Sequence, residues 1–231
     1  MAAIGNLSVR YRPVRRLGLL HAGLLLYGAS MSLMIRANLG LDPWDVFHQG
    51  VSKLTGLSFG VAVIAISAVV LLFWIPLRQK PGIGTISNAI VIGLTVDAMN
   101  TVLPAPSLLW LRWVYGVGGV LATGVASGLY IGARLGPGPR DGLMTGVAIR
   151  WHGRWFAQIR VVRTAIEVLV LGVGFAMGGT IGPVTVLYAL GIGPLAHVMI
   201  PIFAVRDPAP APVTEAATVV TETEPALARA A

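Results

Sequence analysis

Two short stretches hold the residues best suited to chemistry in this chain. The first, GLDPWDVFHQG, begins at Gly40 and contains Asp42, Asp45, His48 and Gln49. The second, GPGPRDGLMTG, begins at Gly136 and contains Asp141 and Thr145. Carboxylates and an imidazole at such spacing could bind a cation, relay a proton or hydrogen-bond a polar solute. Both stretches lie between long apolar segments of a chain with only nine Asp and Glu residues.

The first stretch predicts the start of a helix. Asp42 suits the N-cap, Pro43 the first helical position and Asp45 the third, where a carboxylate meets the positive end of the helix dipole. The second stretch repeats this start with Gly138, a weaker cap, in place of Asp42. After the start, the first helix has an apolar stripe on one face and a polar stripe on the opposite face, both at helical spacing. The polar stripe consists of Asp45, His48, Gln49 and Ser52.

Two interpretations of these short helices stay open. In one, both dip toward the membrane centre as re-entrant helices, and Asp45 and Asp141 face a shared cavity. In the other, the first is an interfacial amphipathic helix, with Trp44 among the lipid headgroups and Asp45 serving only as a capping residue.

The composition predicts an integral membrane protein. Of 231 residues, 55% are hydrophobic and 11% are charged, whereas soluble domains carry about 25% charged residues. A span needs about 20 apolar residues, and in lipid it must be a helix to satisfy its own backbone. We therefore expect an all-α membrane protein whose six transmembrane helices cover residues 17–35, 59–76, 86–103, 113–133, 161–178 and 183–203.

The basic residues predict the orientation. With a cytoplasmic N-terminus, only Arg36, Lys53 and Arg112 fall on the far side, and the cytoplasmic side receives eleven basic residues, which agrees with the positive-inside rule. Both termini are then cytoplasmic. The first apolar segment is of span length and lacks a cleavage site, so it is interpreted as a span. Nucleic acid is not expected as a partner, because no aromatic stacking platform accompanies the charges. The eleven are Arg10, Arg12, Arg15, Arg16, Arg78, Lys80, Arg134, Arg140, Arg150, Arg154 and Arg160.

The two stretches belong to an internal repeat. An offset of 96 residues aligns Gly40 with Gly136 and Asp45 with Asp141, and after a small insertion an offset of 100 aligns Thr85 with Thr185. We expect a basic tail (1–16), two three-helix repeats (17–103 and 104–206), each with a short amphipathic or re-entrant helix, and a disordered tail (207–231). Because three spans is an odd number, the repeats have inverted topology, as in many secondary transporters.

Besides His21, which is interpreted as a packing residue, four ionisable residues fall within the predicted spans. Such groups are costly in lipid, so they usually face a cavity or pair with one another. Arg163 and Glu167 are four positions apart and can pair, while Asp97 and His197 are repeat equivalents. We expect Asp97, Arg163 and Glu167 to act in proton or cation coupling.

The rest of the sequence gives no sign of catalysis, of metal binding or of a cofactor site. The glycine-rich PGIGT, starting at Pro81, could expose N–H groups to an anion, but a tight turn with close helix packing is the favoured interpretation. The chain has no cysteine, no metal-ligand cluster and no nucleophile motif. Neither enzymatic activity nor a cofactor or metal is expected.

The motifs of both repeats resemble the YczE family of bacterial integral membrane proteins, which is related to YitT-like proteins. The resemblance rests on LGLDPWDVFHQGVSKLTGLSFG with PLRQKPGIGTISNAIVIG, and on LGPGPRDGLMTG with VRTAIEVLVLGVGFAMGGTIG. It implies a multi-pass protein of the bacterial cytoplasmic membrane with a transport role, and it supplies no catalytic residues. In one departure from the family pattern, Pro183 and Val184 separate Gly182 from Thr185.

The leading hypothesis is a secondary transporter of a small polar or amphiphilic solute by alternating access. Asp45, His48, Gln49, Asp141 and Thr145 are its predicted substrate path. The alternative is a membrane-embedded accessory protein that docks a cytoplasmic partner through Arg140, Arg150, Arg154 and Arg160. Besides lipid and solute, self-association into a homo-oligomer stays open.

Overall fold

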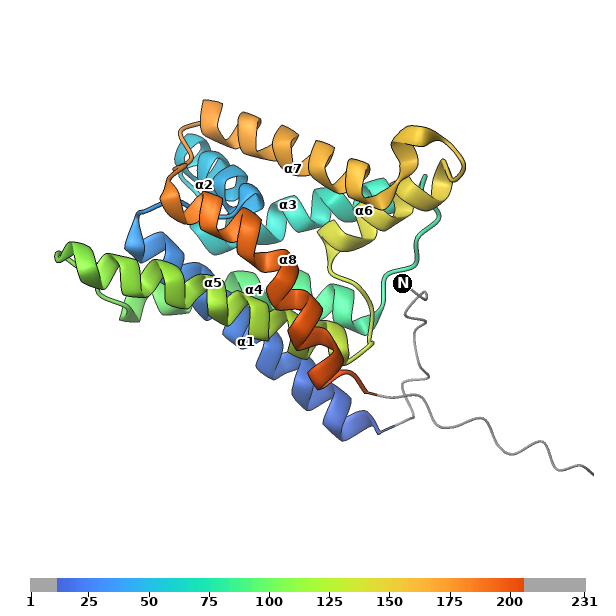
Figure 1. Ribbon diagram of the computed structural model, residues 1–231, viewed down its shortest axis with the longest axis horizontal. Helices are drawn as coiled ribbons and strands as arrows, with labels where there is room; N and C mark the ends of the chain where they lie inside the picture. The colour runs from blue at the N-terminus through green and yellow to red at the C-terminus, as the bar shows by residue number, and fades with distance from the viewer. Residues whose placement is uncertain (1–11, 206–231) are drawn as a thin grey trace, which may run out of the picture.

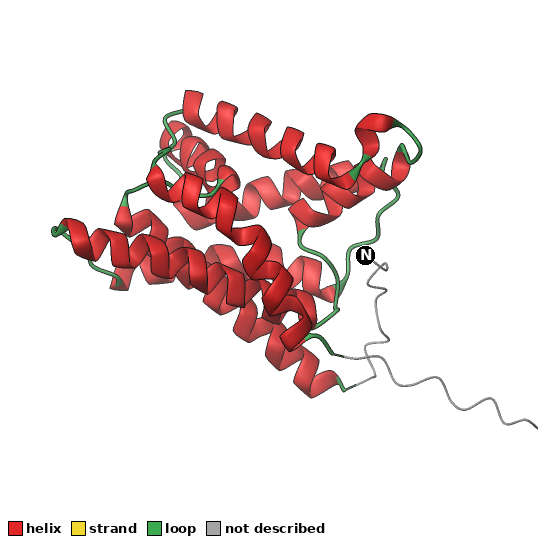
Figure 2. Ribbon diagram, viewed as in Figure 1, coloured by secondary structure: helices red, strands yellow, loops and turns green. Residues whose placement is uncertain are grey.

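Eight α-helices account for most of residues 12–205, the part of the chain that the computed structural model describes, and no strand occurs in this range (Figures 1 and 2). The first eleven residues and the predicted disordered tail (207–231) lie outside it. A short 3-10 helix, η1 (Trp155–Ala157), precedes α7. The helices are α1 (Pro13–Ala37), α2 (Pro43–Thr55), α3 (Phe59–Trp74), α4 (Ile83–Val102), α5 (Leu109–Gly132), α6 (Pro139–Arg150), α7 (Ile159–Ala176) and α8 (Pro183–Phe203).

Four of these helices, α1, α4, α5 and α8, are long and apolar enough to cross a membrane. The pair α2 and α3, bent by 110° at a short break, would make a fifth span if counted as one. The predicted spans at 59–76 and 161–178 correspond to shorter or more charged helices. The 16 residues of α3 are about 24 Å long, and α7 carries Arg160, Arg163 and Glu167.

The four long helices form a continuous set of contacts in which α1 packs against α4 and α5, and α5 packs against α8. The shorter helices α2, α3, α6 and α7 gather together on one side of this set (Figure 1). Among them, α2 packs against α7, and α3 packs against α6. The helices thus pack in matched pairs: α1–α4 corresponds to α5–α8, and α2–α7 corresponds to α6–α3.

Matched hydrogen bonds tie the two halves to each other. Val184 N donates to Leu39 O (3.0 Å), and Gly84 N donates to Leu135 O (2.9 Å). These carbonyls precede equivalent stretches of the predicted repeat. The N–H groups of Gly82 and Gly84 are both occupied, since Gly82 N donates to Thr85 Oγ1. The glycine-rich segment therefore serves close packing rather than anion binding.

Two arginines fasten the ends of α1 and α5 in the same reciprocal way. Arg16 Nε donates to Ala133 O at the end of α5 (2.9 Å), and Arg112 Nε donates to Ala37 O at the end of α1 (2.7 Å). Carbonyls at a helix end have no partner within the helix, and a guanidinium satisfies them well. Arg16 is fully buried, whereas Arg112 is half-buried.

The α3–α6 contact and the equivalent α7–α2 contact each pair a large residue with a glycine, but the large residue is on the opposite helix in the two cases. On α3, Trp74 covers Gly142 of α6, where a Cβ atom would lie 2.0 Å from the indole ring. On α7 the equivalent of Trp74 is Gly174, which lies directly against the backbone of Val46 and Phe47 of α2. The bulky residue is thus on α3 in one contact and on α2 in the other.

The matching fails for one helix pair. α3 packs along α4, but the equivalent helices α7 and α8 are barely in contact and diverge in Figure 1. At the α3–α4 contact, Gly60 and Gly93 meet so closely that a Cβ on Gly60 would lie 2.0 Å from Gly93 O. The carboxylate of Asp97 accepts hydrogen bonds from Gly60 N (2.7 Å) and Ser58 Oγ. We call this contact the Asp97 clasp.

Among the described residues of the second half, no such clasp joins α7 to α8. Gly193, the equivalent of Gly93, would meet no atom within 4 Å if it carried a Cβ. His197 stands at the position of Asp97. α3 is therefore held on α4, whereas a space remains between α7 and α8.

Candidate functional site

The first acidic stretch forms the helix start that its sequence predicts. Asp42 is the N-cap of α2, and its Oδ1 accepts hydrogen bonds from the backbone N–H groups of Trp44 (2.9 Å) and Asp45 (3.0 Å). Asp45 is fully buried, and its Oδ1 lies 3.1 Å from His48 Nδ1. The predicted capping role of Asp42 is confirmed.

The position of Trp44 does not support an interfacial α2. Its side chain is only 5% exposed and packs in a cluster with Val70, Val162 and Met144. A tryptophan at headgroup level would keep its ring at the surface of the protein. The start of α2 lies instead between the halves, among residues of α3, α6 and α7.

The second stretch presents its carboxylate in a different way. Asp141, in the first turn of α6, accepts a hydrogen bond through Oδ2 from the hydroxyl of Tyr130 on α5 (2.7 Å). Gly138 supplies no side-chain cap. Sequence reasoning did not single out Tyr130, because nothing in the local pattern around it indicates a partner eleven residues later.

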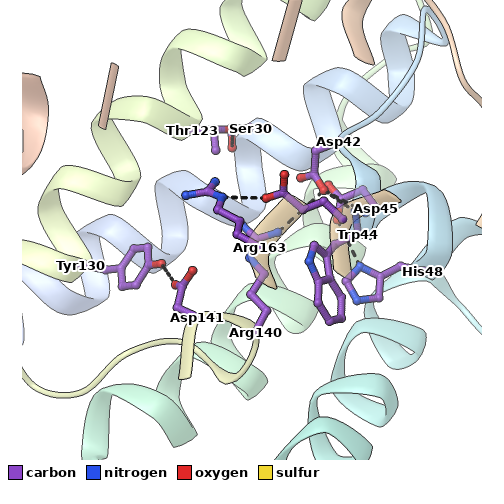
Figure 3. A network of polar contacts seen from close by, with 11 residues as sticks. Ser30, Asp42, Trp44, Asp45, His48, Thr123, Tyr130, Arg140, Asp141 and Arg163 are labelled. Atoms are coloured by element: carbon purple, nitrogen blue, oxygen red, sulfur yellow. Dashed lines mark hydrogen bonds and ion pairs between the residues drawn. The ribbon is translucent and has the colours of Figure 1, made fainter. Parts of the chain in front are cut away.

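Arg140, which the sequence assigns to a cytoplasmic docking surface, contacts residues of the first half of the chain. Its Nη1 lies 3.7 Å from Asp42 Oδ1 in the other half of the chain. The guanidinium also lies over the ring of Tyr27, 5.3 Å from its centroid. Figure 3 shows Arg140 directed toward the residues around the start of α2. A buried carboxylate attracts the nearest cation, so Arg140 is drawn inward rather than left in solvent.

A small cavity and a large cavity adjoin these residues. The small cavity, with a water-accessible volume of about 40 Å³, lies between α3 and α4 on one side and the helix starts on the other. Its wall includes Asp45, His48, Ser67, Asn88 and Asp141. This volume suffices for a few water molecules.

The large cavity, of about 430 Å³, occupies the space between α7 and α8. Its size is that of sites for small organic ligands. Its polar wall residues include Asp42, Arg140, Asp141, Arg163, Glu167 and His197. Arg163 Nε donates to Glu167 Oε1 at 2.9 Å, so this predicted pair forms.

The structure brings together some of the predicted site residues and separates others. Asp45, His48 and Asp141 line the small cavity, and Asp141, Arg163 and Glu167 line the large one. Three residues line neither cavity. Gln49 Oε1 accepts from Thr180 N, the exposed Thr145 donates to Asp141 O, and Asp97 forms the clasp.

The two cavities correspond to each other under the offsets of the predicted repeat. Of the sixteen residues around the small cavity, eleven have their repeat equivalents in the wall of the large one. For example, Ser67 corresponds to Glu167, and Ile92 corresponds to Ile192. Four residues, Trp44, Tyr130, Arg140 and Asp141, line both cavities. The cavities are thus two versions of one space, one narrow and one wide.

Several buried polar atoms around this space lack a hydrogen-bond partner among residues 12–205. They are Tyr27 Oη, Asp42 Oδ2, Trp44 Nε1 and Asp45 Oδ2. Buried polar groups are normally satisfied, and one left without a partner is destabilising. These atoms could therefore be satisfied by water or by a bound solute. Within the same range, no group of three or more His, Asp or Glu side chains is arranged to hold a metal ion.

Comparison with known proteins places the chain in a family. A family profile described as "Family of unknown function (DUF6198)" matches residues 14–201. The chain belongs to this family. The match covers all eight helices up to the last turn of α8, including every residue of both cavities.

Among its relatives is an uncharacterized protein of Haemophilus influenzae, 36% identical over 203 residues, which cover 88% of this chain and 90% of that protein. The uncharacterized membrane protein YczE of Bacillus subtilis is 34% identical over 184 residues, 78% of this chain and 83% of its own length. YyaS of the same organism is 30% identical over 185 residues, 78% and 90% of the two chains. No significant match is found among solved structures. The YczE resemblance is confirmed, and the chain is a multi-pass membrane protein.

Proposed function

We propose that this protein is a secondary transporter that moves a small polar or amphiphilic solute by alternating access. The observation that carries the proposal is the pair of equivalent cavities of unequal volume. In a carrier of two related halves, the conformation of one half in one state is adopted by the other half in the second state. The present structure, with α3 closed on α4 and α7 apart from α8, then represents one of the two states.

The proposal includes the topology. We infer that α3 and α7 cross the membrane with the four longer helices, which makes six spans in two inverted repeats with both termini in the cytoplasm. The reciprocal hydrogen bonds and the matched helix pairs support this arrangement. At 16 residues, α3 would match only a thin or locally thinned hydrocarbon layer.

The Asp97 clasp is the device that holds the small cavity closed. In place of the coupling role expected from the sequence, we assign Asp97 the role of a gate residue. Opening the small cavity requires α3 to leave α4, which breaks the hydrogen bonds to Gly60 N and Ser58 Oγ. In the second state we expect α7 to approach α8.

Single cysteines test this proposal, since the chain contains none of its own. Ser127→Cys reports on the large cavity and Ser67→Cys on the small one. With a membrane-impermeant maleimide, we expect the Ser127→Cys variant to react from one side and the Ser67→Cys variant to be protected. Adding Asp97→Ala should increase labelling at position 67 from the opposite side and decrease labelling at position 127.

The matched control is Thr101→Ala, an exposed position one turn further along α4, which should leave both rates unchanged. Labelling at positions 67 and 127 from the same side, or a gain at 67 with no loss at 127, would contradict alternating access. If the labelling supports alternating access, solute uptake into proteoliposomes would identify what is carried.

A second candidate function, docking of a cytoplasmic protein, has one favourable observation. Arg150, Arg154 and Arg160 are exposed around the α6–α7 connection, next to Trp151 and Trp155, which are 40% and 79% exposed. The fourth predicted arginine, Arg140, contacts Asp42 and Tyr27 and is only partly exposed. Replacing the three exposed arginines with glutamine should abolish co-purification of such a partner while leaving the cysteine labelling pattern unchanged.

A further inference from the structure

The chemistry around the two cavities indicates the charge of the solute. Their walls contain four carboxylates but only two guanidinium groups, those of Arg140 and Arg163. Arg163 is held by Glu167 at 2.9 Å and Arg140 lies 3.7 Å from Asp42. The remaining carboxylates, Asp45 and Asp141, form no ion pair with an Arg or Lys among the described residues. Asp45 contacts His48, and Asp141 accepts a hydrogen bond from the Tyr130 hydroxyl, with the Arg163 guanidinium close enough to interact with it electrostatically.

An anion is disfavoured at the same place. Asp45 and Asp141 each lie in the first turn of a short helix, where the backbone dipole would otherwise attract negative charge. Their carboxylates already occupy these positive ends. In addition, Asp42 Oδ2 and Asp45 Oδ2 are buried acceptors without a donor in the described part of the chain.

One cationic side chain of the protein itself is already held by a carboxylate and an aromatic ring. The Arg140 guanidinium lies 3.7 Å from the Asp42 carboxylate and over the face of the Tyr27 ring, 5.3 Å from its centroid. A carboxylate combined with an aromatic face is a common recognition element for ammonium and guanidinium groups. In the large cavity, Asp141 lies in a wall that also contains Tyr130 and Tyr188, together with aliphatic residues such as Ile192.

We propose that the large cavity binds an organic cation, a protonated amine with an apolar body, with Asp141 as its counter-ion. The aliphatic and aromatic wall would cover the body, and the volume of about 430 Å³ accommodates a molecule of this kind. This inference rests on the proposed transport function, because the cation is the transported solute only if the protein is a carrier. The binding itself can be tested without transport.

The test is equilibrium binding of radiolabelled 2-phenylethylamine to the purified full-length protein in detergent. Three competitors share most of its skeleton but differ in charge: neutral 2-phenylethanol, anionic 3-phenylpropanoate and zwitterionic phenylalanine. We expect saturable binding of the amine, displacement by unlabelled amine and little displacement by the other three. Equal competition by the alcohol, the acid or phenylalanine would overturn the charge assignment, as would the absence of amine binding.

Variants locate the binding in the large cavity. Asp141→Asn should weaken amine binding about 30-fold, the usual minimum for removing one partner of a buried charge pair. Asp141→Glu keeps the charge and should restore most of the affinity. Arg150→Gln, at the exposed end of the same helix, is the control and should bind like the parent protein. If Asp141→Asn binds as tightly as the parent while remaining folded by its melting temperature, Asp141 is not the counter-ion.

The two proposals can fail separately. Amine binding without any reciprocal change in the maleimide labelling of the Ser67→Cys and Ser127→Cys variants would leave a cation-binding protein that is not a carrier. Reciprocal labelling without amine binding would leave a carrier whose solute belongs to another chemical class.

Discussion

In the first half of the molecule α3 lies against α4, and in the second half α7 stands apart from α8, although equivalent helices surround both pairs. The difference depends on a few contacts. Asp97, Gly60 and Gly93 close the first pair, whereas His197 and Gly193 face a cavity in the second. The halves share a scaffold and differ at the places where helices separate. A near-symmetric framework with unequal contacts is suited to two states of similar free energy.

The largest effect should come from breaking the contact between α3 and α6. Gly142→Val would place side-chain atoms where the Trp74 ring lies, since even a Cβ would be 2.0 Å from it, and should destabilise the fold by more than about 3 kcal/mol. The double variant Trp74→Gly/Gly142→Val copies the sizes of the Gly174–Val46 contact and should recover part of the loss. Melting temperatures in detergent would measure both. A double variant no more stable than Gly142→Val would show that the two contacts are not interchangeable.

A smaller effect should distinguish the two arginines that fasten α1 and α5. Arg16→Met removes hydrogen bonds from a fully buried guanidinium to Ala133 O and Arg134 O and should lower stability by about 3 kcal/mol. Arg112→Met removes the equivalent bonds at a half-buried position, where water can replace them, and should lower it by about 1 kcal/mol. Thermal unfolding monitored by circular dichroism gives the comparison, and equal losses would mean that burial does not separate the two sites.

The smallest effect concerns the helix starts, where Asp42 caps α2 and Gly138 leaves α6 without a side-chain cap. Asp42→Ala removes the cap and should lower the stability by about 1 kcal/mol. Asp42→Asn retains the cap and should lower it by only a few tenths. The melting temperatures of the two variants report the difference. If both fall equally, the interaction of Asp42 with Arg140, rather than the cap, is what stabilises this helix start.

Much of the local structure could be predicted from the sequence. The Asp42–Pro43 pair marked the start of α2 because capping depends on neighbouring residues only, and the repeat offset paired Asp45 with Asp141. The contact of Arg140 with Asp42 was not predicted, because positive-inside counting considers loop arginines only by their side of the membrane and ignores a buried carboxylate in the other half of the chain. Tyr130 was not recognised for a similar reason, since its partner Asp141 comes close only through the fold.

The unequal cavities could not be predicted from the sequence. Repeat alignment treats the halves as equal, so it predicts one shared space without indicating which side is wide. Which cavity is wide depends on contacts such as that between Gly60 and Gly93. The distance between these two residues is set by the packing of the whole helices α3 and α4. The re-entrant and interfacial interpretations of α2 also share one hydrophobic pattern. Only the neighbours of Trp44 in the folded chain distinguish them.

The reciprocal attachment of Arg16 and Arg112 has a consequence for biosynthesis. Arg16 is synthesised at the start of the first helix, but its acceptors at the end of α5 are synthesised more than a hundred residues later. Until then the Arg16 guanidinium lacks these two native acceptors. The first half therefore cannot complete its native packing before α5, a helix of the second half, has been synthesised.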